Sequence, residues 1–168
     1  MIVIALGANL SSAIGAPRET LSAALKKLAQ SGVEIAATSA FYESEAWPDP
    51  TDPPFVNAVA IVRTELSPAA LMAKLHEIES SFGRQRSVPN APRTIDLDLI
   101  DYDGRVETGP PVLPHPRMER RAFVLVPLAK VAPAWRHPIS GKTVEDMIAE
   151  LPRETGSISE LRVFGRAP

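Results

Sequence analysis

The spacing of hydrophobic residues predicts an alternation of strands and helices along the chain. A continuous apolar run over residues 2–6 is typical of a fully buried strand. Over residues 17–30 the apolar positions recur with the helical period, and Gly32 supplies the stop that commonly ends a helix. An extended segment over residues 33–42 then leads into a proline-rich loop at 44–54, where no regular element is expected.

A second series of elements follows this loop. Residues 57–63 predict a strand, and Ser67, which is followed by a proline, predicts the start of a helix that runs to about Phe82. Residues 94–102 alternate between apolar and polar positions, which predicts a further strand. An Asp-Gly pair within residues 103–106 then indicates a hairpin turn.

The predicted order of elements is β-α-β-β-α-β, which favours an α+β fold of the ferredoxin-like kind. In that arrangement two helices pack on one face of an antiparallel sheet. Helices expected over residues 123–131 and 143–151 would form an appended C-terminal helical layer. Neither an internal repeat nor a linker interrupts the pattern, so residues 1–168 are expected to form a single domain.

Composition narrows the class of protein. The 168 residues are 45% hydrophobic and include no cysteine, which excludes a disulfide framework and a thiolate metal site. Neither a signal peptide nor an apolar run of membrane-spanning length is present, so a cytoplasmic protein without a membrane partner is expected. The net charge of −2 argues against a broad nucleic-acid surface.

The strongest chemical signal is an acidic pair in the strand over residues 94–102. A strand's period of two puts Asp96 and Asp98 on one face, with apolar residues on the other. Two neighbouring carboxylates repel each other unless a cation lies between them, and hard oxygen ligands favour magnesium. The alternative is an amphipathic surface strand whose outer face is acidic.

Arginines flank this pair in the sequence. Three occur within the segment 84–93, which has no acidic residue, and a second group follows His115; they are Arg84, Arg86, Arg93, Arg117, Arg120 and Arg121. A guanidinium donates two parallel hydrogen bonds to phosphate, and phosphate-bound magnesium needs one or two protein carboxylates. The combination favours a nucleotide-phosphate clamp, whereas any one arginine taken alone is more often a solvated surface charge.

The segment 91–99, Ala-Pro-Arg-Thr-Ile-Asp-Leu-Asp-Leu, resembles the signature of the hydroxymethyldihydropterin pyrophosphokinases. The resemblance spans about residues 2 to 135. Further segments similar to family blocks are 5–10, 41–42, 55–58, 83–86 and 113–123. The resemblance implies transfer of the terminal diphosphate of ATP to the hydroxymethyl group of 6-hydroxymethyl-7,8-dihydropterin, with AMP as the second product, by a monomer in folate biosynthesis.

The resemblance also implies how the nucleotide would be held. Two magnesium ions would lie on Asp96 and Asp98, and Arg84, Arg86 and Arg93 would neutralise the charge that develops during transfer. The residues implied to contact or lie near ATP are His76, Glu79, Arg84, Arg86, Arg93, His115 and Arg121.

A pterin slot is the second implication. By similarity Phe55 and Phe123 would sandwich the ring, Asn57 would read its amide edge, and Gly7 would leave room. Residues Ser44, Glu45 and Trp47 would complete the slot from the proline-rich loop. Two aromatic faces and a side-chain amide suit a flat heterocycle, although each phenylalanine alone is more often ordinary core.

The sequence departs from the family pattern at two places. Segment 89–93 is shorter than usual and lacks an arginine and a tryptophan, which puts loop closure in doubt, and Trp47 is a candidate replacement lid. Pro116 stands where a tyrosine is common, which puts one ATP contact in doubt.

Two rival functions predict different features. An RNA-binding module would carry exposed aromatics in an RNP-type run and a basic surface, and neither occurs in the sequence. A catalytically silent pterin- or nucleotide-binding domain would have lost part of the acidic and arginine set, which is complete here. Magnesium-dependent ATP binding and turnover discriminate between an enzyme and a silent domain.

Overall fold

The fold is built on a mixed α/β arrangement with one antiparallel sheet. The computed structural model describes residues 1–46, 49–84 and 92–152, and the backbone of residues 162–166. The strands run in the order β5-β1-β4-β3-β6, and β2 pairs separately with β4. Their bounds are β1 Ile2–Ala8, β2 Glu34–Thr38, β3 Ala40–Ser44, β4 Phe55–Arg63, β5 Asp96–Tyr102 and β6 Arg162–Arg166.

Over the described residues, four helices and one short 3₁₀ turn accompany the sheet. They are α1 Pro17–Gln30, α2 Pro68–Ser81, the 3₁₀ turn Met118–Arg120, α3 Ala122–Val131 and α4 Val144–Ala149. The predicted cap of α2 is confirmed, because the Ser67 hydroxyl accepts a hydrogen bond from the Ala70 N–H at 3.3 Å. Gly83 follows α2 with φ of +78°, a conformation that glycine adopts without the strain of a side chain.

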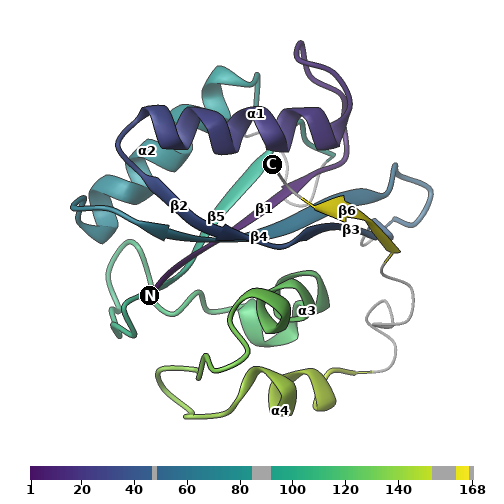
Figure 1. The fold of residues 1–168 in the computed structure, drawn as a ribbon. Helices are drawn as coiled ribbons and strands as arrows, with labels where there is room; N and C mark the ends of the chain where they lie inside the picture. Colours follow the sequence, from purple (N-terminus) through teal and green to yellow (C-terminus); the bar gives the residue numbers. More distant parts are fainter. Residues whose placement is uncertain (47–48, 85–91, 153–161, 167–168) are drawn as a thin grey trace.

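The helices cover both faces of the sheet, as Figure 1 shows, with α1 and α2 on one side and α3 and α4 on the other. On β1, Ile4 and Leu6 face the first pair of helices and pack with leucines of α1 and α2. Val3 and Ala5 face the opposite way and pack against α3. This alternation follows from the period of two in a strand, and it makes β1 a central strand that is buried on both faces.

The extended segment predicted over residues 33–42 is two strands rather than one. Both β2 and β3 pair antiparallel with β4, one after the other along it, and the strand is interrupted between them at Ser39. The Ser39 hydroxyl accepts from the Val59 N–H at 3.0 Å and donates to the Ala40 carbonyl at 2.7 Å. A buried serine thus satisfies the backbone groups that the break would leave without partners.

The turn predicted after β5 is confirmed, but the prediction of a hairpin is wrong because no second strand follows it within the described residues 105–152. Asp103 and Gly104 adopt left-handed conformations, and the Arg105 N–H closes the turn onto the Tyr102 carbonyl at 3.0 Å. No strand follows within residues 105–152, and the outer edge of β5 is covered by other groups. The Glu79 carboxylate accepts from the Leu97 N–H at 2.8 Å, and the His115 N–H donates to the Ile100 carbonyl at 2.8 Å. Such contacts cover backbone groups that an edge strand would otherwise leave unpaired.

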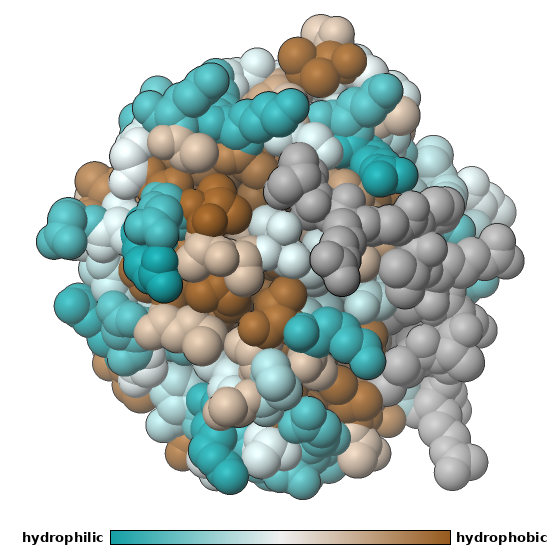
Figure 2. All heavy atoms as spheres, viewed as in Figure 1, coloured by the Kyte–Doolittle hydropathy of each residue, from teal (hydrophilic) through white to brown (hydrophobic). Residues whose placement is uncertain are grey.

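Polar side chains dominate the face seen in Figure 2, with smaller apolar patches between them. The large apolar side chains that are exposed in the described part of the chain are scattered, as Ile14, Val106 and Ile139 illustrate. None of the helices that the structure describes combines the length and apolar character needed to cross a bilayer.

The central position of β1 gives a stability prediction. Ile4 is fully buried in the first core, whereas Ile139 is 66% exposed. We expect Ile4→Ala to lower the free energy of unfolding by about 2 to 5 kcal/mol, because the change removes buried methyl groups and leaves a cavity. The matched change Ile139→Ala should stay within about 0.5 kcal/mol. Urea unfolding measures both, and similar losses in the two variants would contradict the assignment of the core.

Candidate active site

A row of three residues across the middle of the sheet defines the centre of the site. Gly7 on β1 lies opposite Asn57 on β4 and opposite Asp96 on β5. Cross-strand partners point to the same face of a sheet, so Asn57 and Asp96 face the side covered by α3. One row further along β1, Ala5 lies opposite Asp98. The acidic pair and the amide are therefore neighbours on one surface, although they are far apart in the sequence.

Arginines surround the acidic pair in the fold as well as in the sequence. Arg93 donates to one oxygen of Asp96 at 2.8 Å, and Arg84 donates to the other. Arg121, at the start of α3, donates to Asp98 at 2.7 Å. The Asp96 and Asp98 side chains are 25% and 28% exposed. The guanidinium groups, which also face solvent in part, therefore compensate the negative charge of the two carboxylates.

Arg84 joins this cluster to α2 across the edge of the sheet. The same nitrogen of Arg84 donates to Asp96, to the Glu79 carboxylate and to the Ile95 carbonyl, the last at 3.0 Å. The Glu79 side chain is only 2% exposed and also holds the Leu97 N–H. Glu79 is thus an anchor for Arg84 and for β5 in this structure.

The pKa values of Asp96 and Arg84 follow from burial and from neighbouring charge. Burial opposes ionisation of Asp96, but Arg84, Arg93 and Arg121 outweigh it and hold the pKa of this carboxyl below its usual range. Burial alone would lower the pKa of the Arg84 guanidinium, but Asp96 and Glu79 raise it. An ionised pair is the result.

His115 carries a different protonation state. Burial and the charges of Arg121 and Arg117 lower the pKa of its imidazole, against the opposing effect of Asp98. The ring is therefore neutral at pH 7. Its Nδ1 accepts from the Arg117 N–H at 3.2 Å, which leaves the proton on Nε2, 4.0 Å from Asp98. His115 is placed as a hydrogen-bond donor rather than as a charge.

The amide side of the site is built from β3 and β4. Asn57 is buried, and its Nδ2 donates to the Ser44 hydroxyl at 2.9 Å. A Cβ on Gly7 would lie 3.3 Å from Asn57 Oδ1 and 3.9 Å from the ring of Phe55. Glycine therefore keeps the space beside the amide open.

Two phenylalanines are linked to the acidic pair through arginines. The Arg93 guanidinium lies over the ring of Phe55 at 5.8 Å, and the Arg121 guanidinium lies over the ring of Phe123 at 5.5 Å. Phe123, near the start of α3, is 36% exposed. Each arginine thus contacts one carboxylate and one aromatic ring, so the aromatic and acidic parts form one connected surface.

Two of the residues expected from the sequence, His76 and Glu45, do not join this cluster, and two others are not among the described residues. Within the described residues, no hydrogen bond or ion pair connects the side chain of His76 with the acidic pair. Glu45 is exposed at the end of β3. Trp47 and Arg86 lie outside the described residues.

Sequence reasoning assigned no role to Asn9, which the structure places beside the site. Its side chain is 4% exposed and bonds the Pro53 carbonyl and the Arg93 N–H. The available signal was its place in the segment after the first strand, which resembles a family block. The contacts themselves join segments that are distant in sequence, so no local pattern reveals them.

The acidic pair fits a magnesium ion bound together with phosphate. Asp96 and Asp98 offer hard oxygen donors on one face of β5, and both are partly exposed. Within the described residues there is no group of three or more acidic or histidine side chains that could hold a metal by itself. The donor set is therefore suited to an ion that takes its remaining ligands from water and phosphate.

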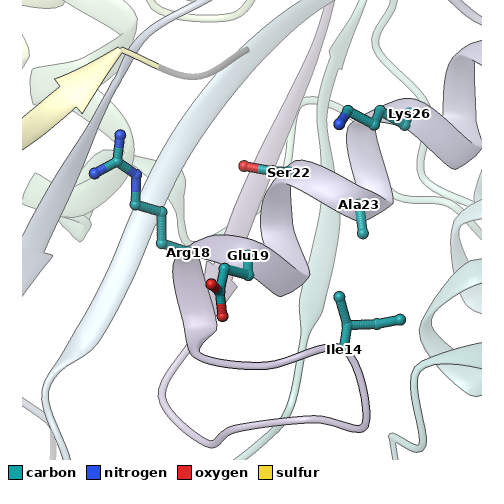
Figure 3. Close-up of a pocket in the computed structure, with 6 residues that line it drawn as sticks. All are labelled: Ile14, Arg18, Glu19, Ser22, Ala23 and Lys26. Atoms are coloured by element: carbon teal, nitrogen blue, oxygen red, sulfur yellow. The ribbon is translucent and has the colours of Figure 1, made fainter.

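An open hollow on the described surface lies away from this cluster. It is an open groove of about 480 Å³ beside α1, which Figure 3 shows. The residues that line it are Ile14, Arg18, Glu19, Ser22, Ala23 and Lys26. None of them belongs to the acidic pair, to the arginines around it or to the amide side of the site. Charged groups at fixed positions, rather than the size of a cavity, mark the candidate site.

Paired carboxylates held among arginines suit an enzyme that binds a phosphorylated substrate, and the amide beside an open space and an aromatic ring suits the edge of a flat heterocycle. A comparison with protein families identifies the particular family. The family model of 7,8-dihydro-6-hydroxymethylpterin-pyrophosphokinase (HPPK) matches residues 3–133, and the chain belongs to this family.

Individual relatives agree with the family match. The chain is 42% identical over 151 residues to the 2-amino-4-hydroxy-6-hydroxymethyldihydropteridine pyrophosphokinase of a Synechocystis species, covering 89% of this chain and 75% of that protein. It is 40% identical over 145 residues to the protein of that name from Methylorubrum extorquens, covering 85% and 90%. A crystal structure of Plasmodium falciparum HPPK-DHPS, a triple mutant with STZ-DHP, has a TM-score of 0.72 at 11% identity. That match covers 96% of this chain and 46% of the other, and it shows a shared fold.

The contacts of Arg84 yield a prediction about stability. We expect Arg84→Met to lower the free energy of unfolding by about 3 kcal/mol, because it removes a counter-charge from the buried Glu79. The loss should be smaller when Arg84→Met is made in a Glu79→Gln background, because the fully buried charge is then gone and the only charge that loses its contact with Arg84 is the partly exposed Asp96. Arg63→Met, which breaks an exposed pair with Glu34, is the control and should cost less than about 1 kcal/mol. Chemical denaturation measures each value, and equal losses in both backgrounds would contradict the coupling.

Proposed function

We propose that the chain transfers the diphosphate of ATP to the hydroxymethyl group of 6-hydroxymethyl-7,8-dihydropterin in folate biosynthesis, giving the pterin diphosphate and AMP. The proposal rests on the family match and on one observation above all. Gly7 lies directly between Asn57 and Asp96, so a heterocycle at the amide and a nucleotide phosphate at the carboxylates would meet over one strand.

The proposal includes the ferredoxin-like form of the fold. The strand order β5-β1-β4-β3, with α1 and α2 on one face, supports that arrangement. Helices α3 and α4 on the opposite face form the appended layer, and residues 1–168 act as one domain. The site lies on the face of the appended layer, at the end of α3 from which Arg121 and Phe123 project.

On the phosphate side, the arginines bind and orient the triphosphate. Arg84, Arg93 and Arg121 are already fixed by ion pairs with Asp96 and Asp98, so little rearrangement precedes binding. His115 donates from Nε2 to a phosphate oxygen. The full set assigned to the nucleotide is His76, Glu79, Arg84, Arg86, Arg93, His115 and Arg121, in which Glu79 acts by anchoring Arg84.

Asp96 and Asp98 would hold two magnesium ions in the loaded enzyme. Magnesium held there would supply charge neutralisation to the phosphate oxygens. The carboxylates are suited to this task because the arginine charges keep the Asp96 carboxyl ionised. The same arginines are within reach of the incoming phosphate oxygens, which compete with the carboxylates for their N–H groups.

On the pterin side, the ring lies between Phe55 and Phe123, and its amide edge pairs with Asn57. Ser44 fixes the orientation of the Asn57 amide through the hydrogen bond to Nδ2. Gly7 leaves the space that a side chain would fill. Glu45 and Trp47 complete the slot from the loop that follows β3.

The reaction is an in-line displacement at the β-phosphorus. The hydroxymethyl oxygen forms the new O–P bond, the bond between the β-phosphorus and the oxygen bridging to the α-phosphorus breaks, and that oxygen leaves with AMP. The hydroxyl proton is released to solvent. Arg84, Arg86 and Arg93 neutralise the charge that accumulates on the transferred group, so positioning and electrostatics supply most of the rate acceleration.

Product analysis tests the proposed reaction. Purified protein incubated with ATP, magnesium and 6-hydroxymethyl-7,8-dihydropterin should form AMP and pterin diphosphate in equal amounts, as chromatography would show. A chelator in excess over magnesium should stop turnover. Formation of ADP would indicate ordinary kinase chemistry, and bound ATP without turnover would indicate a silent binding domain.

Removing either carboxylate tests the phosphate side. We expect Asp96→Ala and Asp98→Ala each to lower kcat by at least about 100-fold, because charge neutralisation in the transition state is lost. Circular dichroism should remain that of the wild type. Glu34→Ala removes an exposed acidic residue from β2 and should leave kcat unchanged. Near-normal turnover in either aspartate variant would refute the assignment.

A further inference from the structure

Asn9 connects the two sides of the site through one buried side chain. Its Nδ2 donates to the Pro53 carbonyl at 3.0 Å, and its Oδ1 accepts from the Arg93 N–H at 2.8 Å. The backbone N–H groups of Asn9 and Leu10 both donate to the Arg93 carbonyl at 3.1 Å. Asn9 therefore holds the Arg93 backbone at both its N–H and its carbonyl group.

These contacts belong to a continuous series of interactions that links the pterin side of the site to the phosphate side. Pro53 stands two residues before Phe55, the ring over which the Arg93 guanidinium lies at 5.8 Å. The same guanidinium donates to Asp96 at 2.8 Å. Asn9 thus joins the segment that carries Phe55 to the segment that carries Arg93. The Arg93 side chain in turn contacts both the Phe55 ring and the Asp96 carboxylate.

The chemistry of the contacts explains why an amide is needed. One side chain must accept from a backbone N–H and donate to a backbone carbonyl in two different directions. An aspartate retains the acceptor but cannot donate to Pro53 when ionised, and an alanine provides neither group. Because Asn9 is 4% exposed, water cannot readily replace either contact.

We infer that Asn9 is a positioning residue that couples the pterin and nucleotide sites. It keeps Phe55 and Arg93 in fixed relative positions, so that a nucleotide held by Arg93 and Asp96 also fixes the Phe55 ring, against which the pterin would bind. The inference rests on the proposed function. It concerns a residue that touches neither substrate and acts through the two segments that it holds together.

Binding measurements test this role directly. The nucleotide is the α,β-methylene analogue of ATP with magnesium, because the bond that the reaction breaks is then replaced by a stable one. Calorimetry gives the affinity for 6-hydroxymethylpterin with and without this analogue, and the ratio of the two affinities measures the coupling. We expect Asn9→Ala to reduce the ratio by about tenfold for each coupling hydrogen bond lost.

Two further variants separate positioning from general stability. Asn9→Asp keeps the size and the acceptor, and it should lose coupling through the missing donation to Pro53 even if Asn9→Ala folds poorly. Ser39→Ala is the matched control, because Ser39 is also a buried side chain that accepts from one backbone N–H and donates to one backbone carbonyl. It should lower the melting temperature without changing the ratio.

The outcomes distinguish this inference from the proposed function. A wild type that binds neither ligand overturns both. A wild type that binds both ligands without coupling, or Asn9 variants that keep the wild-type ratio, overturns the positioning role and leaves the function standing. A reduced ratio in both Asn9 variants, with the ratio retained in Ser39→Ala, supports the role.

Discussion

The register of β1 between β4 and β5 is the constraint on which the site depends. It sets Gly7 beside Asn57 on one side and Asp96 on the other, so groups from distant parts of the chain meet in one row. A shift of one residue in either pairing would turn Asn57 or Asp96 into the opposite core. The apolar residues that alternate with the row prevent such a shift, because Leu6 and Leu97 would then leave the core formed with α1 and α2.

Charge balance is the second condition for the site. Two partly buried carboxylates on one strand are unfavourable unless cations compensate them, and these cations are Arg84 and Arg93 from before β5 and Arg121 from after it. A phosphate group presents to these arginines the same oxygen chemistry as the carboxylates do. The ion pairs that stabilise the free protein therefore also orient the groups that bind a nucleotide.

The sequence predicted elements best where local physics determines them. The helix of residues 17–30 has its predicted bounds because an apolar stripe of helical period, a proline at the first position and a glycine after the end agree. The alternation around Asp96 and Asp98 placed both carboxylates on one face for the same reason, since the period of a strand is local. The family resemblance added Phe55, Asn57 and Phe123, which local pattern alone does not distinguish from core residues.

Features that depend on distant partners were not predictable in this way. The break at Ser39 exists because β4 pairs with two successive segments, and β6 exists because β3 offers it an edge. The cover on the outer edge of β5 comes from Glu79 and from the backbone of His115 rather than from the adjacent hairpin. The contacts of Asn9 could not be predicted for the same reason, because its partners Pro53 and Arg93 are 44 and 84 residues away in the sequence.

The extent of α3 explains why the site lies where it does. This helix covers Ala5 and Val59 on the second face of the sheet, which pack in one core with Leu125, whereas Asp98, the partner of Ala5 on β5, stays partly exposed. The next row holds Gly7 and its two polar partners, at the end of the helix where Arg121 turns back to Asp98. A single strand thus contributes to a dry core under the helix and to a polar surface just beyond it. The rigidity of the core is thereby transmitted to the groups that must be held in place, which is the arrangement that catalysis by positioning requires.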